Sequence, residues 1–131
     1  MANIQQISPI KAHKYLQTYA LLIDLREGEE VEELSFHVPF VDNVAYSLFD
    51  QNYEDIPQNR IVILACHTGE KSHKAAQFLL AKGWDAEKIF CLEGGLEAWK
   101  KDNFPTIKIN RGFTMGKASY SQSIDRTDTT Y

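Results

Sequence analysis

The residue with the clearest potential for chemistry is Cys66, which follows a continuous apolar run at residues 61–65. Residues 67–71 are polar and form a short loop before a helical pattern begins at residue 72. In a loop between a strand and a helix, backbone N–H groups can converge on an anion, and the helix dipole adds positive charge there. Both effects favour the cysteine thiolate, which is the nucleophilic form. The sequence therefore predicts a reactive cysteine.

Two other loop residues have a chemical reason for their positions. Gly69 allows backbone angles that a side chain would forbid, and the positive charge of Lys71 suits an anionic substrate. His67 and His73 flank the loop, but nothing in the sequence places either ring on the Cys66 sulfur. For both histidines, a place at the pocket mouth and a place on the exposed surface stay open.

The elements that position this loop alternate between strands and helices. Strands buried on both faces are expected at residues 20–24, 60–65 and 88–92, where an apolar run has a single charged residue at one end, Asp24, Arg60 or Lys88. Helices are expected from the Ser8 cap to residue 19, over residues 72–82, and after Gly94-Gly95. This alternation predicts an α/β domain with a mainly parallel central sheet. Sites in such folds lie at the carboxyl ends of the strands.

The segments between these elements are less sharply patterned. Residues 26–34 are expected to form a loop or short helix, residues 37–44 a connector into a short strand, and residues 47–55 a weak helix. From about residue 107 the composition becomes polar and apolar periodicity disappears. We therefore expect one domain over residues 1–106 and a mobile polar tail over residues 107–131.

Composition excludes several classes of protein. The chain has 131 residues, the size of one ordinary domain, and a net charge of -4, which argues against nucleic acid as the main partner. No run is long enough to cross a bilayer and no signal-peptide core precedes the domain, so we expect no membrane partner and a cytoplasmic location. The four histidines and two cysteines lack metal-ligand spacing, and Cys91 lies in an apolar strand, where packing is its expected role.

Four segments, in order along residues 7–105, resemble the signatures of the rhodanese family. They are Asp24-Leu25-Arg26, His37-Val38-Pro39, the loop from Cys66 to Ser72, and Leu92-Glu93-Gly94-Gly95-Leu96-Glu97-Ala98-Trp99. The resemblance implies a three-layer α/β/α rhodanese-like domain. The chain departs from the family pattern at Phe36 and Phe40-Val41, where glycine and Gly-Ala are expected, and at Lys71, where many members have arginine.

The resemblance also implies an activity, that of a thiosulfate sulfurtransferase. Cys66 would attack the outer sulfur of a donor such as thiosulfate, and the resulting persulfide would pass its sulfur to cyanide or to a thiol on a small molecule or protein. No metal or organic cofactor is implied, and the oligomeric state stays open. The residues implied to bind substrate are His67, Thr68, Gly69, Glu70, Lys71 and Ser72, with Asp24 and Arg26 in support.

Two other functions compete with this interpretation. The first is a cysteine-loop phosphatase or arsenate reductase, but the phosphatases place arginine five residues after the cysteine, where this chain has Ser72. The second is a non-catalytic interaction module of the same fold. The presence of both Cys66 and Lys71 favours the enzyme over the module.

Overall fold

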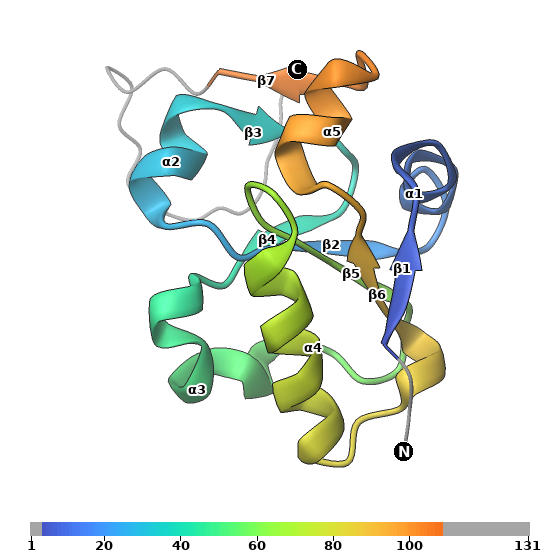
Figure 1. Ribbon diagram of the computed structural model, residues 1–131, viewed down its shortest axis with the longest axis vertical. Helices are drawn as coiled ribbons and strands as arrows, with labels where there is room; N and C mark the ends of the chain where they lie inside the picture. Colours follow the sequence, from blue (N-terminus) through green and yellow to red (C-terminus); the bar gives the residue numbers. More distant parts are fainter. Residues whose placement is uncertain (1–3, 109–131) are drawn as a thin grey trace.

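Five short parallel strands form the central sheet of the computed structural model, which describes residues 4–108 (Figure 1). Their order across the sheet is β1-β6-β5-β2-β4, so the strand that precedes Cys66 is central. The bounds are β1 Gln5–Ile7, β2 Leu21–Asp24, β4 Val41–Asn43, β5 Val62–Ala65 and β6 Ile89–Leu92. The expected strands at residues 20–24, 60–65 and 88–92 are thus confirmed.

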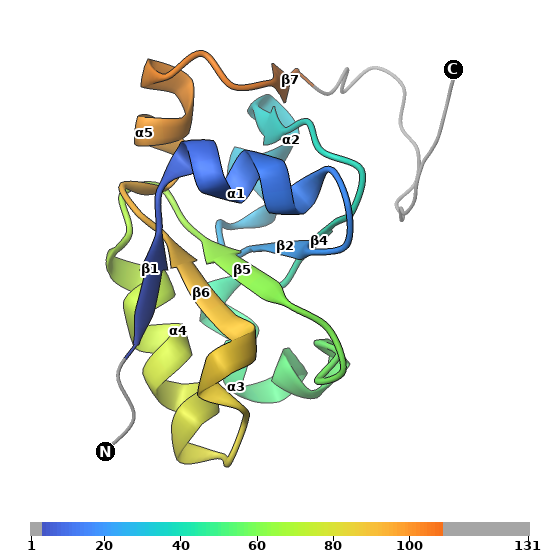
Figure 2. The ribbon, with the colours of Figure 1, turned by 90° about the vertical axis from the view of Figure 1, so that its right-hand side faces the viewer.

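Helices cover both faces of this sheet. Figure 2 shows α1 and α5 on one side of the strands and α3 and α4 on the other. The helices are α1 Pro9–Leu16, α2 Gly28–Glu33, α3 Phe49–Asn52, α4 Glu70–Ala81 and α5 Gly95–Lys101. Short 3-10 turns η1 Tyr46–Leu48, η2 Tyr53–Asp55 and η3 Ala86–Lys88 complete the set. The three-layer α/β architecture with a parallel sheet is confirmed.

Alternation along β5 decides which layer receives the cysteine. Val62 and Leu64 pack into the core beneath α3 and α4, whereas Ile63 and Ala65 pack into the core beneath α1 and α5. Successive strand residues point to opposite faces, so Cys66 falls on the side of α3 and α4.

The start of α4 differs from the expectation by two residues. We expected a loop over residues 66–71 and a helix from residue 72, but α4 begins at Glu70. Gly69 is its N-cap with φ of +115°, and its carbonyl accepts hydrogen bonds from the Ser72 hydroxyl and the His73 amide. Because glycine adopts positive φ without strain, the chain can enter the helix directly after it. The loop is therefore shorter than expected.

The remaining segments agree with the sequence in part. Ser8 caps α1 as expected, and its hydroxyl accepts from the Lys11 amide at 3.3 Å. Residues 26–34 contain α2, residues 37–44 lead into β4, and residues 47–55 are helical but broken into separate turns. Strand β1 and the antiparallel pair of β3 Ser35–Phe36 with β7 Thr106–Ile107 were not predicted.

The limit of the domain was expected at residue 106, and β7 extends one residue further. The tail expected over residues 107–131 falls, from residue 109 onward, outside the described residues.

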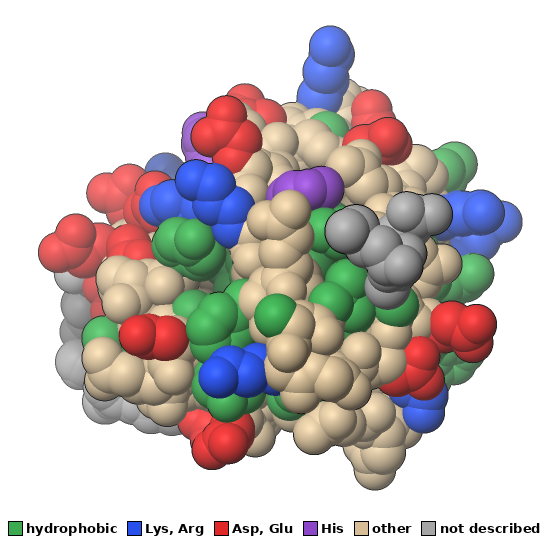
Figure 3. Space-filling view, turned by 60° about the horizontal axis from the view of Figure 1, so that its bottom comes forward, with side chains coloured by type: hydrophobic (Ala, Val, Ile, Leu, Met, Phe, Trp, Pro, Cys, Tyr) green, Lys and Arg blue, Asp and Glu red, His purple; other side chains and the backbone are tan. Residues whose placement is uncertain are grey.

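Both tryptophans are buried. Trp99 belongs to α5 and packs in the core that α5 shares with α1, and its indole N–H donates to the Pro105 carbonyl at 2.8 Å. Trp84 joins an aromatic group with Tyr53 and Phe78 on the α3 and α4 side. Figure 3 views that end of the molecule, where hydrophobic and basic side chains lie close together. Within residues 4–108, no helix combines the length and the apolar content needed to cross a membrane.

Candidate active site

Cys66 lies directly after the central strand β5, at the carboxyl edge of the sheet. Its side chain is buried, with 3% of its surface exposed, and the Gly69 N–H donates to its Sγ at 3.0 Å. Within residues 4–108 no second hydrogen bond reaches this sulfur. A backbone N–H directed at sulfur stabilises negative charge there, as amides do for other buried anions.

The loop that carries Cys66 is held from the far side by the start of α5. The Leu96 N–H donates to the Cys66 carbonyl at 2.8 Å, and the Glu97 N–H donates to the His67 carbonyl at 3.1 Å. This approach requires glycine at position 95, because a Cβ atom there would overlap the Cys66 carbonyl oxygen and lie 2.7 Å from the His67 carbonyl carbon. Gly95 also has φ of +61°.

We expected Gly94-Gly95 to serve helix entry and packing, and the contact with the cysteine loop was missed. The signal available in the sequence was the position of these two glycines just after β6. Both β5 and β6 end at the same edge of the sheet, so the turn after β6 must lie beside the turn after β5. A pair of glycines at that point indicates that two backbones approach closely.

A groove of about 570 Å³ lies beside the loop, between α4 and the ends of β1 and β6. Thr68, Gly69 and Glu70 contribute to its wall, and Cys91 contributes from β6, but Cys66 is not part of its lining. The groove therefore does not open directly onto the Cys66 sulfur. No group of three or more His, Cys, Asp or Glu side chains in the described part of the chain could hold a metal ion.

The charged side chains of the loop point outward. The His67 ring is 55% exposed and its Nε2 lies 3.1 Å from a carboxylate oxygen of Glu97 on α5. The Lys71 ammonium lies 5.7 Å from the centre of the Tyr46 ring and forms no ion pair within residues 4–108. Its charge is therefore not neutralised by a described carboxylate. Thr68 and Glu70 are exposed as well.

Ser72 and Cys91 lie beneath the loop and are buried. The Ser72 hydroxyl donates to the Gly69 carbonyl at 2.9 Å, and the Cys91 thiol donates to the Ser72 carbonyl at 3.3 Å. Burial raises the pKa of the Cys91 thiol from 9.0 to about 11, so this cysteine is protonated at neutral pH. Both cysteines are free thiols.

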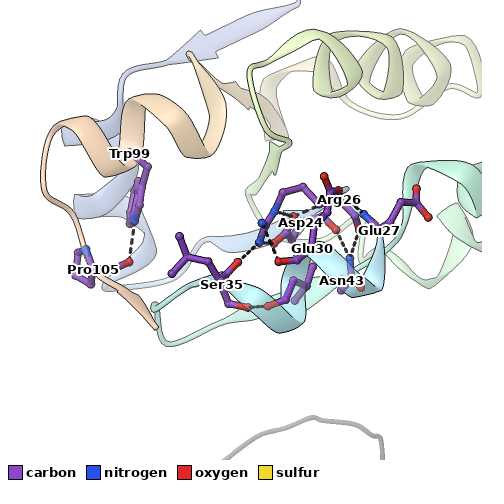
Figure 4. A network of polar contacts seen from close by, with 10 residues as sticks. Asp24, Arg26, Glu27, Glu30, Ser35, Asn43, Trp99 and Pro105 are labelled. Atoms are coloured by element: carbon purple, nitrogen blue, oxygen red, sulfur yellow. Dashed lines mark hydrogen bonds and ion pairs between the residues drawn. The ribbon is translucent and has the colours of Figure 1, made fainter. Parts of the chain in front are cut away.

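Asp24, the last residue of β2, and Arg26 form a buried ion pair (Figure 4). Two guanidinium nitrogens of Arg26 donate to the two Asp24 carboxylate oxygens, at 3.0 and 2.9 Å. Burial raises the pKa of the Asp24 carboxyl, and the bonds from Arg26 oppose that rise. Arg26 also donates to the carbonyls of Glu30 and Leu34, which ties the pair to α2.

Neither side chain of this pair bonds to residues 66–71 in the described structure. Their connection to the loop is through the backbone, because the Leu25 N–H between them donates to the Ala65 carbonyl at 2.7 Å. The pair therefore lies next to the segment that precedes Cys66, and its side chains make no described hydrogen bond to the loop itself.

The departures from the family pattern have two different outcomes. Phe36 is buried and packs edge-on against Trp99, with the ring centres 5.4 Å apart. The Arg26 guanidinium carbon lies 5.8 Å from the centre of the Phe36 ring. Phe40 is 43% exposed, and the Arg60 guanidinium lies 5.1 Å from the centre of its ring. The first replacement fills the core, whereas the second places an aromatic ring on the surface.

Comparisons with known proteins show which sequences and folds this chain resembles. The chain is 28% identical over 105 residues to the thiosulfate sulfurtransferase GlpE of Actinobacillus pleuropneumoniae, which covers 76% of this chain and 90% of that protein. A rhodanese-related protein from Thermoplasma volcanium has a similar fold, with a TM-score of 0.70, 20% identity, and coverage of 79% of this chain and 98% of that chain. The rhodanese-like domain of an Anabaena protein gives a TM-score of 0.69 with 18% identity and covers 98% of each chain.

The sequence relationship supports sulfurtransferase function at the level of the family, and the structural likeness supports the fold. The family model described as Rhodanese-like domain matches residues 8–102, which include the cysteine loop and the α5 segment that holds it. The chain therefore belongs to the rhodanese-like domain family.

Proposed function

We propose that the protein is a sulfurtransferase that carries sulfur as a persulfide on Cys66. The observation that carries this proposal is the Gly69 N–H directed at the Cys66 Sγ at 3.0 Å, in a loop that α5 holds from behind. A donor amide of this kind stabilises the negative charge of the thiolate before reaction, and that of a sulfur bound to it afterwards. The similarity to a thiosulfate sulfurtransferase supports thiosulfate as the class of donor.

The reaction has two steps. In the first, the Cys66 thiolate attacks the outer sulfur of thiosulfate; the sulfur–sulfur bond of the donor breaks, a new one forms to Cys66, and sulfite leaves with the electron pair. In the second, the thiolate of an acceptor attacks the outer sulfur of the persulfide, and the Cys66 thiolate is released. With cyanide as acceptor the product is thiocyanate. No oxidant is consumed in either step.

Lys71 is the residue we assign to attract the dianionic donor. Its ammonium is exposed, lies in the first turn of α4, and forms no ion pair among the described residues. Lysine offers a point charge and lacks the planar fork of arginine, so it attracts an oxyanion without fixing its orientation. His67 and its Glu97 partner border the same loop, and we assign them to its outer rim.

Mass spectrometry of the intact protein tests the proposal. After incubation with thiosulfate and removal of excess donor, the protein should gain the mass of one sulfur atom and lose it again on addition of cyanide. The Cys66→Ser variant should gain nothing, whereas the matched Cys91→Ala variant should gain as the unaltered protein does. No gain in the unaltered protein, or hydrolysis of an aryl phosphate faster than thiosulfate turnover, would contradict the proposed reaction.

A further inference from the structure

The two cysteines are joined by a series of hydrogen bonds that passes through the first turn of α4. The Cys91 thiol donates to the Ser72 carbonyl, the Ser72 hydroxyl donates to the Gly69 carbonyl, and the Gly69 N–H donates to the Cys66 Sγ. The side chains involved are 0% exposed at Ser72, 2% at Cys91 and 3% at Cys66. Water therefore does not compete for these bonds.

Gly69 is the flexible point in this series. Glycine has the widest choice of backbone angles, so its observed φ of +115° is selected by the groups that bond to it and not by its own preference. Its N–H bonds to the Cys66 sulfur on one side. On the other side its carbonyl accepts from the Ser72 hydroxyl at 2.9 Å and from the His73 N–H at 3.3 Å. The hydroxyl makes the shorter of the two bonds.

We propose that Ser72 is a positioning residue for sulfur transfer. Its hydroxyl holds the peptide plane that carries the Gly69 carbonyl, which limits the φ and ψ of Gly69 and so keeps the neighbouring plane, with the Gly69 N–H, directed at the Cys66 sulfur. The resemblance to the family implied that Ser72 binds substrate, but its buried side chain touches the loop from beneath and acts on the sulfur only through Gly69. This assignment rests on the proposed function, because it concerns the same sulfur.

The test is the Ser72→Ala variant, read by the pH dependence of Cys66 alkylation. Alanine removes the hydroxyl, leaves little empty space and favours the helix, so the variant is expected to fold. With the Gly69 amide less firmly directed at the sulfur, the pH profile of alkylation by iodoacetamide should move to higher pH. Loading by thiosulfate should slow by about tenfold, the factor typical of one lost hydrogen bond. Ser72→Thr keeps the hydroxyl, so it should restore the pH profile of alkylation. It should also bring the rate of loading by thiosulfate to within about twofold of that of the unaltered protein.

Ser35→Ala is the matched control. Ser35 is also buried, and its hydroxyl donates to the Val31 carbonyl at 2.6 Å, away from the cysteine loop. This variant should lose stability by a similar amount and keep the alkylation profile and the loading rate of the unaltered protein. If Ser72→Ala also keeps the alkylation profile and the loading rate of the unaltered protein, Ser72 is structural only. The same conclusion follows if Ser72→Thr shows the same changes as Ser72→Ala.

The two proposals fail in distinguishable ways. If the unaltered protein takes no sulfur from thiosulfate, the proposed function is wrong, but the alkylation profile still reports whether the Ser72 hydroxyl acts on the Cys66 sulfur. If the unaltered protein loads sulfur and the profile of Ser72→Ala does not move, only the positioning role is overturned.

Discussion

Replacing Gly95 by alanine is expected to destabilise the protein and to stop sulfur loading, because this glycine allows α5 to hold the cysteine loop. The new Cβ atom would overlap the Cys66 carbonyl oxygen and lie 2.7 Å from the His67 carbonyl carbon. Both neighbours are backbone atoms, so neither can move aside by changing a rotamer. The loop and α5 must separate, and the hydrogen bonds from Leu96 and Glu97 to the loop carbonyls are weakened or lost.

The magnitude follows from these contacts. A non-glycine residue in the left-handed region costs about 1–2 kcal/mol, and each lost hydrogen bond costs about 1 kcal/mol. With the steric overlap added, we expect the free energy of unfolding to fall by about 3 kcal/mol or more. Domains of this size are typically stable by about 5–15 kcal/mol, so most molecules of the variant should still be folded in water. The free energy of unfolding of the variant can therefore be measured by urea unfolding.

Gly83→Ala separates the backbone cost from the overlap. Gly83 also has positive φ, +91°, but a Cβ atom there meets no heavy atom within 4 Å. It should cost only about 1–2 kcal/mol and leave sulfur loading unchanged. If Gly95→Ala is no less stable than Gly83→Ala and still loads sulfur from thiosulfate, the contact between α5 and the cysteine loop is unimportant and our reasoning is wrong.

Three further predictions concern charge and burial. In steady-state kinetics, Lys71→Ala should raise the KM for thiosulfate by about tenfold. In urea unfolding, it should change the free energy of unfolding by less than about 0.5 kcal/mol, because the Lys71 ammonium is exposed. An unchanged KM would refute the role of Lys71 in attracting the donor. The raised pKa of Cys91 means that the folded state holds its proton more tightly than the unfolded state, so its contribution to stability is fully present below pH 9.0 and is lost as pH rises toward about 11. That loss, about 2–3 kcal/mol, should be absent from Cys91→Ala in urea titrations across this range. Asp24→Ala should cost about 3–5 kcal/mol, because it leaves the Arg26 guanidinium buried without its partner carboxylate; a cost below about 1 kcal/mol in urea unfolding would contradict a buried pair.

Much of the fold follows from local patterns in the sequence. The continuous apolar runs locate the central strands β2, β5 and β6, since a parallel strand covered on both faces has no polar side. Ser8 followed by Pro9 marks the start of α1, where the serine hydroxyl and the proline ring each suit the first turn. The alternation of these elements is sufficient to predict an α/β domain.

The elements that were missed depend on contacts distant in the sequence. Strand β1 is three residues long and exists because Gln5–Ile7 pairs with the edge of β6, and β3 exists because Ser35–Phe36 meets β7. Segments this short have no periodicity that separates a strand from a loop.

The cysteine loop was located from the sequence, but the way it is held was not. The position of Cys66 after a buried strand predicts its place at the edge of the sheet. The role of Gly95 had a signal in its position after β6, but the atoms it approaches could not be predicted. The role we propose for Ser72 had no such signal, because it acts through the Gly69 carbonyl, whose direction depends on the positive φ of Gly69. Backbone direction within a loop is a tertiary property, and residue types alone do not determine it.

The amide proton of Gly69, followed by NMR as thiosulfate is added, tests most directly whether the backbone holds the sulfur. In the unloaded protein this amide donates to Cys66 Sγ, and after loading the negative charge lies on the outer sulfur. If the amide holds that charged sulfur, the Gly69 resonance should move when thiosulfate is added, and cyanide should return it. The Cys66→Ser variant should show neither change. If the protein gains a sulfur atom while the Gly69 resonance stays in place, the persulfide is stabilised by other groups and the amide has no part in holding it.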